Sequence, residues 1–161
     1  MKNFLMCSLT IFTILFTIGC SRMETQVIGK GDDAGADDVG NIGRVAFGFT
    51  PDTWGTDAYT INAATLQDDT LTLNVSYSGG CETHAFTLVA EQRFLESLPV
   101  QLRVSLAHNA NGDTCEARIT EDLHFDLTPI KEAYQKGYQT DAGAIVLYLK
   151  DAPPSDLFYD F

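Results

Sequence analysis

Four side chains near the middle of the chain are of types that could act together in chemistry. Cys81 stands three residues before His84, and His108 stands seven residues before Cys115. Thiolates and imidazoles bind zinc in proteins, whereas two cysteines that meet in an oxidising compartment form a disulfide. The four residues therefore predict either a covalent cross-link or a Cys2His2 metal site.

Two strictly alternating strands are expected to bring these residues together. Apolar side chains occupy every second position over 71–77 and again over 100–106, which is typical of half-buried strands. The first strand runs toward the turn that holds Cys81, and the second runs toward the turn before Cys115, so both turns should lie at one end of the fold. Side-chain alternation then predicts that all four candidates point inward, at the mouth of the core.

Cysteine usage favours the cross-link. Of the four cysteines, Cys7 lies in an apolar leader and Cys20 at its end, which leaves Cys81 and Cys115 as an even pair in an exported domain. We expect a Cys81–Cys115 disulfide and no cofactor. A metal site would need both thiols to stay reduced, and its spacing is looser than that of zinc fingers. The metal site at Cys81, His84, His108 and Cys115 remains the alternative.

The start of the chain has the form of a secretory signal. Lys2 precedes an apolar run, Phe4 to Ile18, that is too short to span a bilayer. The ending Thr17-Ile18-Gly19-Cys20 resembles the lipobox of bacterial lipoproteins, with Thr17 in place of the usual Leu. This resemblance implies that residues 1–19 are a signal peptide and that Cys20 carries acyl chains such as palmitate. The protein is then anchored to the membrane by its N-terminus, and the Ser that follows Cys20 implies the outer membrane.

A polar segment separates the expected anchor from the domain. Residues 20–43 are rich in Gly and Asp and show no strand or helix period, so we interpret them as a flexible acidic linker. The whole chain has 22 acidic and 10 basic residues, a net charge of −12. This charge argues against nucleic acid as a partner. An envelope protein is the partner that we expect.

Residues 44–161 are expected to form one all-β domain. The pattern predicts a single antiparallel β-sandwich, or a partly open barrel, of about seven or eight short strands. One short crossover helix is expected from Thr128 to Gly137, with Pro129 at its first turn. Asn111-Gly112 predicts a tight hairpin, a simpler interpretation than the calcium loop that Asn109-x-Asn111-Gly112-Asp113 partly matches. Residues 157–161 are expected to be a packed aromatic tail or an edge strand.

One segment resembles a known family. The sequence "HNANGD" followed by "FDLTPI", between Val100 and Ile130, is similar to the C-terminal β-sandwich of the NigD-like lipoproteins, in which an "HN..GD" turn precedes a strand ending in "FDL". This sequence departs from the family by its cysteines in both turns and by having no room for a separate N-terminal barrel. The resemblance implies a fold and an envelope location, and no reaction.

Three functions are compatible with these features. We favour a non-catalytic, lipid-anchored envelope module that binds a partner or has a structural role. A metal-binding lipoprotein using the Cys2His2 cluster is the second, and a hydrolase with an unrecognised site is the third. The sequence has no Gly-x-Ser-x-Gly motif and no phosphate-binding glycine loop, so we expect no enzyme.

Overall fold

The computed structural model describes residues 42–48 and 50–161 of the chain. The predicted signal peptide, Cys20 and nearly all of the predicted linker lie outside these residues. No helix in the described ranges is long and apolar enough to cross a bilayer. The elements, in chain order, are β1 (Ile42–Phe47), the 3-10 helix η1 (Pro51–Thr53), β2 (Thr60–Gln67), β3 (Thr70–Gly79), β4 (Ala85–Ala90), β5 (Val100–Asn109), β6 (Ala117–Asp126), α1 (Thr128–Tyr138), β7 (Ala144–Leu149) and β8 (Asp156–Asp160).

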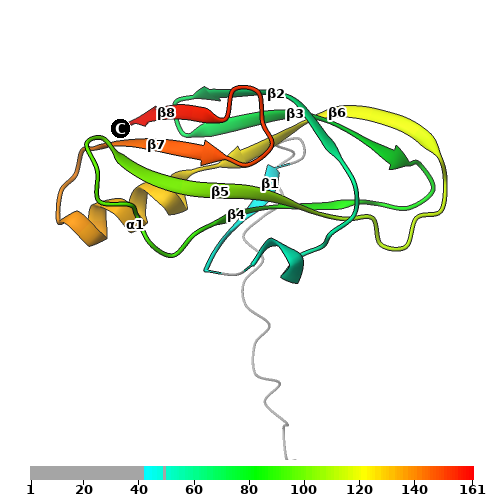
Figure 1. Cartoon of the computed structure of the whole chain (residues 1–161), viewed down its shortest axis with the longest axis horizontal. Coiled ribbons are helices and arrows are strands. Elements are labelled where there is room, and N and C mark those ends of the chain that lie inside the picture. The colour runs from blue at the N-terminus through cyan, green and yellow to red at the C-terminus, as the bar shows by residue number, and fades with distance from the viewer. Residues whose placement is uncertain (1–41, 49) are drawn as a thin grey trace, which may run out of the picture. The chain divides into compact units, whose positions relative to one another are not determined.

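The eight strands form one curled sheet in the order β2-β3-β6-β1-β4-β5-β7-β8, which makes a nearly closed barrel (Figure 1). The all-β class with a single helix is confirmed, and the barrel is the arrangement found. The sheet is not purely antiparallel, because β1 runs parallel to both β4 and β6, and β5 runs parallel to β7. The gap between the edge strands β2 and β8 is bridged by a hydrogen bond. The Tyr159 hydroxyl donates to Asp69 Oδ1 at 2.6 Å.

Strand β1 joins the two halves of the barrel. Ile42 and Gly43 pair with β6, whereas residues 44–47 pair with β4. A Cβ on Gly43 would lie 2.1 Å from a ring carbon of the core residue Phe125, so glycine allows β1 to pass this close to the core. The strand therefore begins two residues before Arg44, and Ile42 and Gly43 belong to the sheet and not to the linker.

Alternation along the strands explains the core. Leu71, Leu73 and Val75 on β3 are 0% exposed, and their polar neighbours lie on the outer face. On β2 the register shifts between Ile61 and Ala63, so the next buried side chain is Ala64. A β-bulge inserts one residue and reverses the side-chain parity beyond it, which is why the simple period fails there.

The tight turn predicted at Asn111-Gly112 is present, but it does not make a hairpin. Both residues have positive φ, 52° and 78°, and the Asp113 amide donates to the Ala110 carbonyl. The flanking strands diverge, since β5 pairs with β4 and β7, whereas β6 pairs with β3 and β1. The turn thus carries the chain from one half of the barrel to the other.

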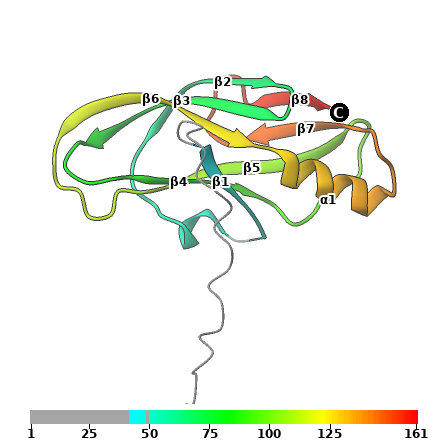
Figure 2. The ribbon, with the colours of Figure 1, turned by 180° about the vertical axis from the view of Figure 1, so that it is seen from behind.

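The C-terminal part of the chain completes the barrel. Helix α1 connects β6 to β7 (Figure 2). Its Ile130 side chain is fully buried. It does not stop at Gly137 as predicted, but continues to Tyr138 and ends where Gln139 adopts φ 53°. Of the two outcomes expected for residues 157–161, the edge strand is found, because β8 pairs with β7 along its length.

Candidate functional site

Two connections cross between the barrel halves at the same end of the fold. Residues 80–84 lead from β3 to β4, and residues 110–116 lead from β5 back to β6. Figure 1 shows both connections at one end of the barrel and α1 at the other. The predicted placement of the two turns at one end is therefore confirmed, and the candidate residues lie on these connections or beside them.

A disulfide joins the two connections. The structure links Cys81 to Cys115, with their Cα atoms 5.9 Å apart and 34 residues apart in sequence. Cys81 is exposed and Cys115 is half-buried, so the expectation that all four candidates point inward is wrong for Cys81. It lies outside the strands, in a turn where the two-residue period no longer holds.

Asp113 belongs to this site, although it was not among the candidate residues predicted from the sequence. Its Oδ2 atom accepts hydrogen bonds from the backbone amides of Gly80, Cys81 and Glu82 at 2.8, 2.9 and 3.0 Å. Its Oδ1 atom accepts one from the Cys115 amide at 2.8 Å. The side chain is 0% exposed. One buried carboxylate therefore holds both connections through their backbones, on the same residues that the disulfide joins.

These amides also fix the charge of Asp113. The Cys115 amide, followed by those of Glu82 and Cys81, holds the pKa of the Asp113 carboxyl well below its ordinary value. Hydrogen bonds from several amides to one carboxylate favour its ionised form. Asp113 is thus an anion throughout the neutral range. The signal in the sequence was an Asp directly after a Gly turn and two residues before a cysteine, a pattern that we assigned to the turn alone.

Two stacked histidines continue from Asp113 into the barrel. His84 Nε2 lies 3.1 Å from Asp113 Oδ2, and His84 Nδ1 lies 2.8 Å from His108 Nε2. His108 Nδ1 lies 3.2 Å from the Ala58 carbonyl oxygen. The His84 side chain is 2% exposed and His108 is 1% exposed. The inward orientation predicted for both histidines is found, and they form a line of contacts from a carboxylate to a backbone carbonyl.

The protons in this line can be counted. Its three contacts each need one N–H, because a carboxylate and a carbonyl at the two ends can only accept. Two neutral imidazoles carry only two N–H groups between them. Full hydrogen bonding therefore requires a third proton, and the pair is then an imidazole with an imidazolium.

A charge is disfavoured on His108. Burial, followed by the charge of His84, lowers the pKa of His108, against smaller opposing effects of the Ala58 and Asp57 backbone. The neutral form is therefore favoured on His108, whose Nδ1 donates to the Ala58 carbonyl. His84 Nε2 donates to the Asp113 carboxylate on the other side.

Aromatic rings pack against the two histidines. The His108 ring stacks on Phe86 with centroids 4.4 Å apart and planes 2° apart, and Tyr77 lies against both histidines. A Cβ on Gly79 would lie 2.4 Å from His84 Nε2, so a glycine is needed where that ring meets the backbone. The Tyr77 hydroxyl donates to Glu121 at 2.6 Å, a bond that adds to burial in raising the pKa of Tyr77.

The arrangement does not assemble the four predicted metal ligands. Both sulfur atoms are in the disulfide, and the histidine nitrogens are turned toward each other, Asp113 and Ala58. Among the described residues, the group with ligand atoms within 4.8 Å of one another is Cys81, Asp113 and Cys115, and it includes neither histidine. His124 is half-buried on β6, and its Nδ1 lies 3.0 Å from Thr72 Oγ1.

Comparison with known proteins identifies structures with a similar fold and does not identify a reaction. No family model and no curated protein matches the sequence. The structure is similar to that of a NigD-like immunity protein from Bacteroides caccae, with a TM-score of 0.50 and 18% identity over 73% of this chain and 58% of that one. The sequence resemblance to NigD-like proteins is thus supported at the level of fold, and this chain spans little more than half of that protein's length.

Two further structures show weaker likeness. A candidate lipoprotein from Bacteroides fragilis has a TM-score of 0.48 and 14% identity over 76% of this chain and 69% of its own. A Bacteroides vulgatus protein of unknown function has a TM-score of 0.45 and 15% identity over 75% of this chain and 56% of its own.

The disulfide should contribute measurably to stability. Closing a loop of 34 residues stabilises a fold by about 3–4 kcal/mol in the chain-entropy model. We expect Cys81→Ser and Cys115→Ser to lower the free energy of unfolding equally, and the double variant to lose no more than either, because each single change breaks the same bond. Denaturant unfolding of the oxidised proteins checks this.

A thiol count provides the control. Alkylation of freshly isolated protein without reductant, followed by mass spectrometry, should leave Cys81 and Cys115 unmodified. Modification of both, together with unfolding of the wild type by a chelator, would contradict the disulfide and favour the Cys2His2 alternative.

The free energy of unfolding should decrease as the pH is lowered from neutrality into the acid range. Because the pKa of His108 is lowered in the folded protein, the unfolded chain takes up a proton first, so stability is lost as pH falls below the ordinary histidine pKa of about 6.5. The lowered pKa of Asp113 adds a further loss below about pH 4. His84, Asp57, Tyr59 and Tyr77 are the other titratable groups that face this pair.

Urea unfolding between pH 5 and pH 7.5 measures this dependence. We expect His108→Gln to be less stable than wild type at pH 7.5 but to show a flatter slope toward pH 5. The comparison variant is His124→Gln on β6, which removes a histidine outside this cluster. An unchanged slope in His108→Gln would contradict the assignment of a neutral, buried His108.

Proposed function

We propose that this protein is a non-catalytic lipoprotein of the cell envelope, whose barrel is a binding or structural module. The main observation behind the proposal is that the polar side-chain atoms of Asp113, His84 and His108 all have hydrogen-bond partners within the protein. The Asp113 carboxylate accepts four amide hydrogen bonds besides its contact with His84. In the described part of the chain, the end of the barrel that holds this cluster contains a cross-link and not a set of reactive groups.

The lack of access supports a structural role for the cluster. A general acid or base must come within hydrogen-bond reach of a substrate proton. His84 and His108 have side chains no more than 2% exposed, and their four ring nitrogens are all within 3.2 Å of protein partners. The thiols are held in the disulfide, so a thiolate nucleophile would first require its reduction.

Location follows from the N-terminal sequence. The lipobox-like ending at Cys20 favours an acylated N-terminus, and Ser21 favours the outer membrane. Residues 20–43 would then separate the lipid from the barrel. The fold likeness to a NigD-like protein agrees with the family resemblance of the "HNANGD" and "FDLTPI" segments. An envelope protein is the partner that this location makes accessible.

The anchor can be tested by fractionation. We expect Cys20→Ser to abolish incorporation of labelled palmitate and to move the protein out of the detergent phase, because acyl chains provide the membrane affinity. Cys7→Ser is the matched control, since it changes a cysteine in the same leader and should leave both properties intact. Wild-type labelling and membrane association of Cys20→Ser would exclude this anchor.

A further inference from the structure

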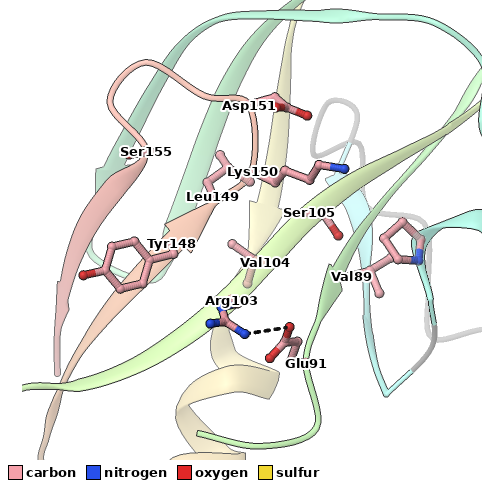
Figure 3. A pocket seen from close by; sticks show the side chains of 11 residues that line it. Val89, Glu91, Arg103, Val104, Ser105, Tyr148, Leu149, Lys150, Asp151 and Ser155 are labelled. Atoms are coloured by element: carbon pink, nitrogen blue, oxygen red, sulfur yellow. Dashed lines mark ion pairs between the residues drawn. The ribbon is translucent and has the colours of Figure 1, made fainter. Parts of the chain in front are cut away.

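A cavity and an exposed turn lie outside the cluster around Asp113. The cavity, of about 460 Å³, is lined by residues of β4, β5 and β7 (Figure 3). Its charged groups are of both signs, since Arg103 pairs with Glu91 at 3.7 Å and Lys150 is followed by Asp151. They favour no ligand of a particular charge. The turn, in contrast, holds two adjacent groups that can react with each other.

The turn is formed by Asn111 and Gly112, between β5 and β6. They are the one Asn-Gly pair of the sequence, and both residues are exposed. Both have positive φ, and a Cβ on Gly112 would have no atom within 4 Å. Because glycine has no side chain, nothing hinders approach to the peptide nitrogen that follows Asn111.

The backbone amide of Gly112 is available for reaction. It makes no hydrogen bond within the described residues, in contrast to the amides of Asn111 and Asp113 on either side. Attack of its nitrogen on Asn111 Cγ closes a five-membered ring. Such an attack joins two groups of the same chain, so it needs no second reactant and gains from their proximity.

The side chain of Asn111 also connects the two segments that the disulfide joins. Its Nδ2 atom donates to the Thr83 carbonyl at 2.6 Å, in an exposed position. Exposed hydrogen bonds outside the core open by local fluctuation more often than those of central strands. Nδ2 is the atom that ring closure expels, so the reaction proceeds when this bond opens, and its product cannot form the bond again.

We propose that Asn111 is a site of covalent modification by deamidation, which removes the hydrogen bond between the two connections. The Gly112 nitrogen bonds to Asn111 Cγ, the Cγ–Nδ2 bond breaks, and ammonia leaves with the proton of the Gly112 amide. Water then opens the cyclic imide at either carbonyl, which gives aspartate or isoaspartate. A carboxylate can only accept, so neither product donates to the Thr83 carbonyl. The reaction requires no enzyme and does not depend on the anchor or on what the barrel binds.

Peptide mass spectrometry tests the site. The full chain, purified from membranes in detergent, is kept folded at neutral pH and digested at intervals. Asn74 is the internal control, because β3 pairs with β2 on one side and β6 on the other. We expect deamidation at Asn111, with isoaspartate among the products, at least about tenfold faster than at Asn74. Isoaspartate that forms at Asn111 in urea but not in the folded chain would overturn the proposal.

Variants separate the reaction from its consequence. Gly112→Ala should slow deamidation by about tenfold, and the comparison is repeated in urea, where the strain of alanine at a positive φ plays no part. Asn111→Asp reproduces one product and should lower the urea midpoint. Asn109→Asp, the matched control, makes the same charge change and keeps the acceptor for the Asn111 amide, so it should lower the midpoint less.

Two results would contradict these expectations. An unchanged rate in Gly112→Ala, folded and in urea, would overturn attack by the Gly112 nitrogen. A wild-type midpoint in Asn111→Asp would overturn the loss of the connection to Thr83.

Discussion

The fold depends on one buried carboxylate. Asp113 lies on the connection between β5 and β6, and it accepts the amides of Gly80, Cys81 and Glu82 from the connection between β3 and β4. Both connections pass between the two halves of the barrel, and irregular backbone in such a position has amides with no strand partner. Hydrogen bonds from amides to an ionised carboxylate are stronger than those between neutral groups. A single side chain provides such bonds to three consecutive residues.

The other features of this end follow from the same constraint. The disulfide connects the residues whose amides Asp113 binds, so the covalent and the polar cross-links act on the same two segments. The negative charge of Asp113 in turn explains why an imidazole N–H donor lies beside it. A buried ion needs a partner, and His84 supplies it through Nε2 at 3.1 Å. His108 then extends the pairing to the Ala58 carbonyl, on the chain between η1 and β2.

Much of this could be predicted from residue patterns, where the signal is local. Alternation over 71–77 and 100–106 identified β3 and β5, and Pro129 marked the start of α1. Chain direction alone placed the two connections together. The pairing of β1 between β4 and β6 could not be predicted, because parallel pairing of strands far apart in sequence leaves no local pattern. The same holds for Asp113, whose three amide partners on the other connection lie 31 to 33 residues away.

The central claim is that Asp113 orders the amides of both connections, and native-state hydrogen exchange tests it most directly. In the wild type, the amides of Gly80, Cys81, Glu82 and Cys115 should be protected although they lie outside the strands. In Asp113→Ala, with the disulfide intact, these four amides should lose protection by more than the amides of the β5 core. Rapid exchange of the four amides in the wild type, or equal loss across the whole barrel in the variant, would contradict the account.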